Sequence, residues 1–248
     1  MHLQYLKRFY PEFRDKKILD LGCGRGDFLL ECHKEGLDIV GIDINPEYIR
    51  ISEEKLKKNG FKPNIIHGKG EKLSFKDNYF DFVNCVEVLE HTQYPEKVLM
   101  ECYRVLKNDG QTFITIHNRF GAKDAHYRLW FLNWMPRFFG KTYIRTMKKY
   151  KDPGKFLDIQ DINKMHYYTY RKFNKIVKQL GFEILDTKKK QLNNPEMILN
   201  EKNRKFIVFF KKIKLDFILN LFYYLLSLFY FNTFHFILKK QIPWIPGK

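Results

Sequence analysis

The stretch LDLGCGRGDF, residues 19–28, decides the fold of this 248-residue chain, because a short apolar run passes directly into closely spaced glycines. The segment that follows, GDFLLECHKEG, has apolar residues at helical spacing, and a second apolar run, DIVGIDI, occupies residues 38–44. A strand, a turn, a helix and a second strand in this order form a βαβ unit, whose strands lie parallel in one sheet. We therefore expect an α/β protein.

The same alternation continues toward the carboxyl terminus. Asn45 and Pro46 begin one expected helix and Thr169 caps another, since these residue types favour those positions. Further strands are predicted at 63–68, 80–88, 111–118, 182–189 and 205–212, the last two as a hairpin. The prediction is a Rossmann-like, seven-stranded, mostly parallel sheet with helices on both faces.

Charge is distributed unevenly along the chain, whose formal net charge is +17. Residues 1–118 hold 18 basic and 19 acidic side chains, residues 119–190 hold 18 and 6, and residues 201–248 hold 9 and 2. With 44% apolar residues, the composition excludes a disordered or collagen-like chain. The basic excess fits a nucleic-acid-binding protein, a membrane-surface protein or an enzyme for anionic substrates.

The four cysteines, Cys23, Cys32, Cys85 and Cys102, form no C-x-x-C pair and lie within expected regular elements. This pattern predicts neither a disulfide framework nor a zinc site, and we expect no metal. Residues 1–17 lack the apolar stretch and the cleavage site of a signal peptide. A cytoplasmic protein is therefore expected.

The glycine-rich turn predicts a ligand other than a dinucleotide. Its glycines let the backbone turn tightly and expose main-chain N–H groups to a ligand; they are Gly22, Gly24 and Gly26. Asp27 follows the third glycine, so the motif G-x-G-x-x-G is not formed, and Asp20 before the first one repels a pyrophosphate and suits an amino acid. Asp43 ends the second strand, where a carboxylate accepts ribose hydroxyls. S-adenosylmethionine carries both an amino acid and a ribose.

Four stretches, in order, resemble the class I S-adenosylmethionine-dependent methyltransferases, in particular the group of ubiquinone-type and small-molecule O-methyltransferases. They are ILDLGCGRGDF, VGIDINPEYI, LSFKDNYFDFVNCVEVLEHTQYPEKVLMECYRVLKNDGQTFITIHNR and YYTYRKFNKIVKQLGFEIL. Together they cover roughly residues 16–118 and 166–210. The resemblance implies the fold predicted above and S-adenosylmethionine as the cofactor.

The resemblance also implies which residues hold the cofactor. Asp20 and the turn that contains Gly22, Cys23, Gly24 and Gly26 would hold the methionine part. Asp43 would bind the ribose and Ile44 the face of the adenine, while Cys85, Val86 and Glu87 would line the inner side of the cofactor. The family often places an Asp near the adenine amino group, whereas this chain has Lys69 and Gly70 there. Adenine contacts are therefore expected from Gly70 and Glu71.

Candidate catalytic residues are His117, at the end of the fifth expected strand, and His91 in the stretch LEHT. Either imidazole could remove a proton from an acceptor hydroxyl, although His91 beside Glu90 could instead order its loop by a hydrogen bond. Four residues after the fifth strand are candidates for substrate binding: Arg119, His126, Tyr127 and Arg128. The stretch NCVEV lacks the [ND]-P-P-[YF] turn of adenine or glutamine methylation, so an oxygen acceptor is predicted.

Two aromatic, basic segments interrupt the alternation, and the chain is predicted to divide at them. Residues 1–118 form the cofactor-binding part, 119–165 a lid, 166–212 the end of the domain and 213–248 a basic-flanked apolar helix. Within the last segment, 217–231 is too short for a membrane span, and polar residues recur along one helical face. The helix could lie at a membrane surface, pack on the domain or on a second copy, or enter the membrane.

These features together predict an S-adenosylmethionine-dependent O-methyltransferase. Its acceptor would be a lipid, a quinone, a lipid-linked glycan or another small molecule, met at the cytoplasmic face of a membrane, with residues 213–248 in peripheral contact. An RNA methyltransferase is the first alternative because of the basic segments, and it is less favoured because no RNA-binding module is present. A non-catalytic cofactor-binding partner protein is the second. Association of copies of the chain stays open.

Overall fold

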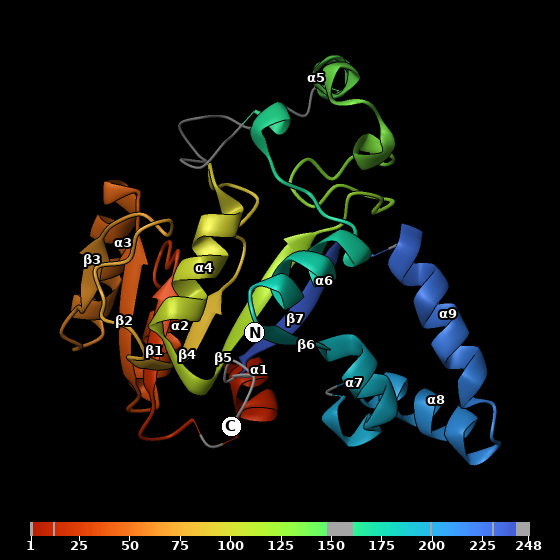
Figure 1. Cartoon of the computed structure of the whole chain (residues 1–248), viewed down its shortest axis with the longest axis horizontal. Helices are drawn as coiled ribbons and strands as arrows, with labels where there is room; N and C mark the ends of the chain where they lie inside the picture. Colours follow the sequence, from red (N-terminus) through yellow and green to blue (C-terminus); the bar gives the residue numbers. More distant parts are fainter. Residues whose placement is uncertain (1, 12, 148–160, 199, 230, 242–248) are drawn as a thin grey trace, which may run out of the picture.

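The computed structural model describes residues 2–11, 13–147, 161–198, 200–229 and 231–241, and it confirms the predicted α/β fold (Figure 1). A single seven-stranded sheet has the order β3-β2-β1-β4-β5-β7-β6. Its strands are β1 (Lys17–Leu21), β2 (Asp38–Asp43), β3 (Ile65–His67), β4 (Phe80–Cys85), β5 (Leu106–His117), β6 (Phe182–Asp186) and β7 (Thr233–Lys240). The first five strands are parallel, and β7 is antiparallel to both of its neighbours.

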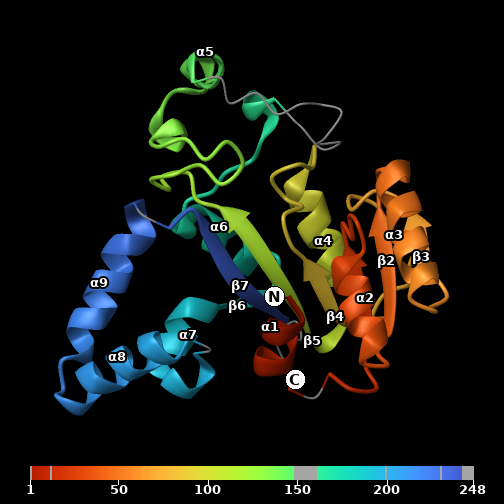
Figure 2. The same ribbon diagram turned by 180° about the vertical axis from the view of Figure 1, so that it is seen from behind.

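Helices cover both faces of the sheet (Figures 1 and 2). One apolar core joins the sheet to α4 (Pro95–Val105) and α6 (Tyr170–Gln179). The core on the other face contains buried residues of α1 (His2–Phe9), α2 (Asp27–Lys34) and α3 (Pro46–Lys58). The result is a three-layer sandwich, as expected for a parallel sheet that is buried on both faces.

The predicted helix starts are present. The Asn45 side chain accepts a hydrogen bond from the Glu47 N–H at 2.9 Å and caps α3. The Thr169 hydroxyl accepts one from the Lys172 N–H at 3.2 Å and caps α6. Each bond satisfies a backbone donor that has no partner within its helix.

The prediction of a strand at 205–212 and a helix throughout 213–248 is wrong. Residues 205–212 belong to α8 (Glu201–Lys212), which follows α7 (Thr187–Asn193), and the helix α9 spans only Asp216–Phe229. The seventh strand is β7, which inserts between β5 and β6 and buries Phe236 and Leu238. The domain therefore continues beyond residue 212, and residues 242–248 lie outside the described part of the chain.

The insertion after β5 lies beyond the carboxyl ends of the parallel strands (Figure 1). Its described part contains α5 (Arg137–Thr146) and the short 3₁₀ turns Leu132–Trp134 and Ile162–Lys164. A small apolar cluster of its own holds it together, formed by Leu129, Leu132, Ile144 and Ile162. Residues 148–160 of the predicted lid lie outside the described part.

Candidate functional site

A cavity with a volume of about 1210 Å³ opens at the carboxyl edge of the parallel strands. Ligands of open α/β sheets bind at this edge. One part of its wall comes from the turn after β1 and the ends of β2 and β3, and another comes from Phe113 and Thr115 of β5 and His235 of β7. Sites for one small molecule have volumes of about 300–1,000 Å³, so the cavity has room for a second molecule beside a first.

Asp43 fixes the glycine-rich turn at one end of the cavity. Its Oδ2 atom accepts a hydrogen bond from the Gly24 N–H at 2.8 Å, and its Oδ1 atom accepts one from the Asn45 N–H at 2.8 Å. A carboxylate oxygen has two lone pairs, so each oxygen keeps acceptor capacity for a ligand hydroxyl. The carboxylate lines the cavity although it is only 8% exposed.

The glycines of the turn are required by close contacts and by the backbone. Gly22 has φ +72°, and a Cβ atom there would lie 2.5 Å from Cγ2 of Val88. Gly26 also has φ +72°, and a Cβ atom there would lie 2.0 Å from the hydroxyl of Ser52 on α3. Only glycine avoids both the strain and the clash. Gly22 therefore shapes the cavity wall, and Gly26 allows the turn to pack on α3.

Asp20, near the end of β1, is not one of the residues that line the cavity, so its contact with the methionine part stays a prediction. The side chain is 2% exposed, and its Oδ1 atom accepts a hydrogen bond from the Asn84 amide at 2.7 Å. Burial raises the pKa of Asp20 to about 7, although the Asn84 hydrogen bond lowers it; the charge of Asp43 adds to the rise.

The cavity brings together many, but not all, of the predicted site residues. Those that line it are Gly22, Gly24, Asp43, Ile44, Gly70, Glu71, Val86, Glu87 and His91. Those that do not are Asp20, Cys23, Gly26, Cys85, His117, Arg119, His126, Tyr127 and Arg128. The four cysteines are free thiols and buried.

Two of the lining residues, Glu71 and Glu87, fix the loops that form the cavity wall. Glu71 accepts a hydrogen bond from the Gln93 N–H at 3.1 Å, so it ties the loop after β3 to the loop that precedes α4. Glu87 has φ +57°, a conformation that non-glycine residues rarely adopt, and its N–H donates to the Thr115 hydroxyl at 2.8 Å. Backbone strain of this kind gathers at functional sites.

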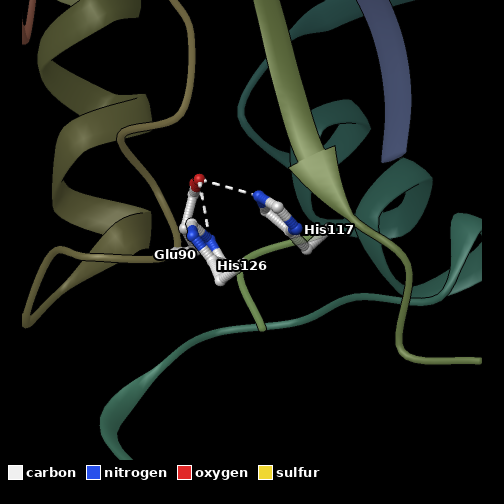
Figure 3. Close-up of side chains that lie close together, drawn as sticks. All are labelled: Glu90, His117 and His126. Atoms are coloured by element: carbon white, nitrogen blue, oxygen red, sulfur yellow. Dashed lines mark hydrogen bonds and ion pairs between the residues drawn. The ribbon is translucent and has the colours of Figure 1, made fainter. Parts of the chain in front are cut away.

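His117 is buried beside Glu90 and His126 (Figure 3), and its Nε2 atom lies 4.0 Å from Oε1 of Glu87, a residue of the cavity wall. Its Nε2 atom is 2.9 Å from Oε1 of Glu90, and its ring stacks between those of His126 and Tyr167, with centroid distances of 4.5 and 5.3 Å. Burial disfavours the imidazolium, but the Glu90 hydrogen bond and the surrounding carboxylates outweigh it and raise the pKa of His117. His117 itself is 0% exposed and cannot touch a molecule in the cavity.

The predicted substrate residues of the insertion are spread apart. Arg119 donates to the Met135 carbonyl at 3.3 Å, and burial and the nearby Arg137 lower its pKa. Tyr127 packs on the apolar cluster of the insertion, and Arg128 is exposed. Only His126 joins the group around Glu90. Several further residues line the cavity, including Tyr48, Thr115 and His235. No local motif in the sequence marks them, because the fold alone brings them to the cavity.

A protein family described as a methyltransferase domain matches residues 19–114, which run from β1 to within β5 and include the glycine-rich turn, Asp43 and Glu87. Residues 19–114 are thus similar to the class I S-adenosylmethionine-dependent methyltransferases, in agreement with the resemblance of the motifs. S-adenosylmethionine is the cofactor of this family. The seven-stranded sheet belongs to a fold that this chain shares with solved methyltransferases.

Curated relatives of this methyltransferase domain include two proteins named ubiquinone biosynthesis O-methyltransferase. The one from Yersinia enterocolitica is 29% identical over 160 residues, which cover 63% of this chain and 62% of the relative. The one from Salmonella paratyphi A is 28% identical over 155 residues, which cover 59% and 60%. The matched region thus spans about three fifths of the length of these relatives.

Solved structures share the fold at lower identity. A methyltransferase from Methanosarcina mazei has a TM-score of 0.56 at 19% identity, covering 94% of this chain and 97% of that one. Phosphoethanolamine N-methyltransferase 2 of Haemonchus contortus, solved with S-adenosylmethionine, has a TM-score of 0.58 at 20% identity, covering 97% and 52%.

The residues in the cavity fit the cofactor of the family. The Asp43 carboxylate offers acceptors for ribose hydroxyls, and the main chain at Gly22 and Gly24 is open to the cavity. Ile44, which is 57% exposed, presents an apolar surface beside them.

Proposed function

We propose that this protein transfers a methyl group from S-adenosylmethionine to a hydroxyl oxygen of a lipid, a quinone or a lipid-linked acceptor at a membrane surface. The observation that carries the proposal is the continuous cavity, which joins the Asp43 end of the sheet to a second wall formed by β5 and β7. A transferase needs two adjoining sites, so that donor and acceptor meet without water between them.

On the donor side, Asp43 would hold the ribose, and the main chain around Gly22 and Gly24 would hold the methionine part. Gly70 and Glu71 would contact the adenine, with Ile44 against its face. The cofactor supplies an electrophilic methyl group on a sulfonium. The protein has to hold that group in line with the acceptor oxygen.

On the acceptor side, His91 is the group placed to receive the hydroxyl proton. It lines the cavity with its side chain 19% exposed, and its Nε2 atom is 3.8 Å from Oε1 of Glu90. A carboxylate at that distance stabilises the imidazolium that forms when a proton is taken up. Glu87 lines the same wall and adds negative charge.

Two observations support oxygen as the acceptor atom. The stretch after β4, NCVEV, lacks the turn that holds planar amino nitrogens in other methyltransferases. The two curated relatives described above, at 28 and 29% identity, are named O-methyltransferases.

The helix α9 supports the membrane part, because it presents its apolar face outward. Two polar residues of this helix face the protein: Ser227 is 7% exposed, and the Tyr223 hydroxyl donates to the Asp186 carboxylate. The opposite face carries Phe217, Leu221 and Phe222 at 62, 56 and 58% exposure. Tyr230, the last residue of the predicted stripe, lies outside the described part of the chain. An outward apolar face is typical of contact with a partner or a membrane.

Positive charge lies next to this face. The exposed basic residues of α8 and the following turn include Lys202, Arg204, Lys205, Lys212 and Lys214, and such residues attract anionic headgroups. No helix among the described residues is long and apolar enough to cross a membrane. With 14 residues, α9 is about 21 Å long, shorter than a hydrocarbon core of about 30 Å. A helix that lies in the interface fits both features.

Binding to anionic vesicles tests the membrane part. We expect the wild type to sediment with phosphatidylglycerol-containing vesicles, and a variant with Phe217→Gln, Leu221→Gln, Phe222→Gln and Leu225→Gln to bind at least about tenfold more weakly, since about 1.4 kcal/mol of lost apolar burial suffices. High salt should weaken the wild type as well.

Met100→Gln is the matched control, because Met100 is 55% exposed on α4, away from α9. This control should bind vesicles like the wild type. Equal binding of the α9 variant and the wild type would contradict a role of α9 at the membrane.

The transferase reaction itself is tested with S-adenosylmethionine labelled in its methyl group. We expect label to enter the organic phase when the protein is incubated with a lipid extract, in bonds that resist mild alkali, as ethers do and esters do not. S-adenosylhomocysteine should appear in equal amount.

A further inference from the structure

Three metal-ligating side chains, those of Glu90, His117 and His126, lie close together although they come from three separate segments (Figure 3). Glu90 lies in the loop between β4 and α4, His117 ends β5, and His126 lies in the insertion. One ligand atom from each lies within 4.8 Å of the other two. We propose that these three residues form a binding site for a divalent transition metal ion, of which zinc is the best fit.

The distances suit a shared ion. Oε1 of Glu90 is 2.9 Å from Nε2 of His117 and 3.8 Å from Nε2 of His126. Zinc binds nitrogen and carboxylate ligands at about 2.0–2.2 Å, so two ligand atoms on one tetrahedral ion are about 3.3–3.6 Å apart. The two distances to Glu90 are within a few tenths of an ångström of that spacing. The rings of His117 and His126 stack on each other, so one ring has to turn before both nitrogens can face the same ion.

Burial supplies an independent reason for a ligand here. Glu90 is 1% exposed, and its second oxygen, Oε2, is buried without a hydrogen-bond partner among the described residues. A buried carboxylate oxygen without a partner is costly, and such groups are normally satisfied by protein, water or an ion. Coordination through both carboxylate oxygens, with Oε1 facing the two imidazoles, would give Oε2 a partner as well.

The surrounding charges favour a cation. Asp124 is 1% exposed and accepts hydrogen bonds from the His126 N–H at 2.9 Å and the Tyr167 hydroxyl at 2.6 Å. It thereby positions the loop that carries His126. Glu87 contributes a third carboxylate, with Oε1 4.0 Å from Nε2 of His117. A divalent ion is well compensated by these carboxylates, while two neutral imidazoles complete the ligand set.

The identity of the ligands indicates which metal. Two imidazoles and one carboxylate form a set that zinc uses, with a fourth position left for water or a further carboxylate. Magnesium and calcium prefer oxygen ligands throughout. Bound there, the ion would fasten the insertion to the end of β5 and to the β4–α4 loop, beside Glu87 and His91 of the cavity wall. None of the three ligands lines the cavity, although His117 and Glu90 lie close to these two wall residues, and zinc binding can be measured without the transfer reaction.

The test uses zinc alone with the full chain, first stripped of metal by a chelator. We expect calorimetry to give one zinc ion per chain, a dissociation constant in the micromolar range or below, and a rise in Tm. Glu90→Gln and His126→Gln should each weaken zinc binding at least about 100-fold, because loss of a ligand exceeds the 10- to 100-fold effect of a supporting residue.

His33→Gln is the control. His33 stacks on Phe61 and is not part of the metal-ligating cluster, so its replacement should leave zinc affinity unchanged. Cobalt(II) serves as a second probe, because its visible absorption reports four-coordinate geometry; the wild type should give the bands and His126→Gln should lose them while its circular dichroism stays native. Absence of stoichiometric zinc binding in the wild type would overturn the proposal. So would a zinc affinity of Glu90→Gln and His126→Gln that equals the affinity of the wild type.

Discussion

Asp43→Ala is expected to weaken the binding of S-adenosylmethionine at least about 100-fold. The carboxylate accepts the N–H groups of Gly24 and Asn45 and is the proposed acceptor for the ribose hydroxyls. Hydrogen bonds to a charged group contribute about 1.5–3 kcal/mol each, and about 2.7 kcal/mol corresponds to 100-fold. Isothermal titration calorimetry with S-adenosylhomocysteine, which does not react, measures the effect.

Two controls separate the ribose contact from the fold of the turn. Asp43→Asn keeps one acceptor oxygen, so its loss of affinity should be smaller than that of Asp43→Ala. Asp38→Asn changes an exposed carboxylate at the start of β2 and should bind like the wild type. If Asp43→Ala folds and binds the cofactor product with unchanged affinity, the assignment of the donor side is wrong.

Asp20→Asn is expected to make the protein more stable at pH 8 in the absence of cofactor. Burial raises the pKa of Asp20 to about 7, whereas an unfolded Asp has a pKa of about 3.9. Between these values the folded state holds a proton that the unfolded state has released. The free energy of unfolding of the wild type therefore falls as the pH rises from about 4 to 7.

The size of this effect follows from the two pKa values. One pKa unit is about 1.4 kcal/mol, so Asp20 costs up to about 4 kcal/mol at pH 8. Asparagine keeps the acceptor for the Asn84 amide without the charge. Urea unfolding at pH 5 and pH 8 should show a gain for Asp20→Asn at pH 8 that is much smaller at pH 5. An equal difference from the wild type at both pH values would show that Asp20 titrates normally.

The first half of the fold was predictable because its signals are local. Each strand from β1 to β5 is a short apolar run, and the caps at Asn45 and Thr169 mark helix starts within a few residues. The glycine-rich turn and Asp43 lie on consecutive elements of one βαβ unit, so their meeting at the sheet edge follows from topology.

The carboxyl-terminal part was not predictable in this way. The run KFIVFFKK has strand-forming residues but lies in α8, where only Ile207 is buried. The strand β7, Thr233–Lys240, instead pairs with β5 and β6, of which β5 lies more than 100 residues away in the sequence. Register with β5 and β6 is set by long-range packing of Phe236 and Leu238 and not by local propensity.

The candidate site also depends on contacts between residues that are distant in the sequence. His117 was recognised from its position at a strand end, but its partner Glu90 lies 27 residues away in sequence, without any ligand spacing. Asp20 directly precedes the glycine-rich turn in sequence, yet its side chain is buried and bonds to Asn84 instead of lining the cavity. Motifs locate the edge of the sheet; which side chains enter the cavity depends on packing.

Transfer of label from methyl-labelled S-adenosylmethionine to a lipid extract tests the central claim most directly. The wild type is expected to place alkali-stable label in the organic phase with stoichiometric S-adenosylhomocysteine, and Asp43→Ala at the same cofactor concentration is not. If the wild type binds S-adenosylhomocysteine tightly and yet transfers no label to lipid, quinone or water-soluble fractions, the protein is a cofactor binder and not a methyltransferase. Label that enters RNA in place of lipid would contradict the proposed acceptor.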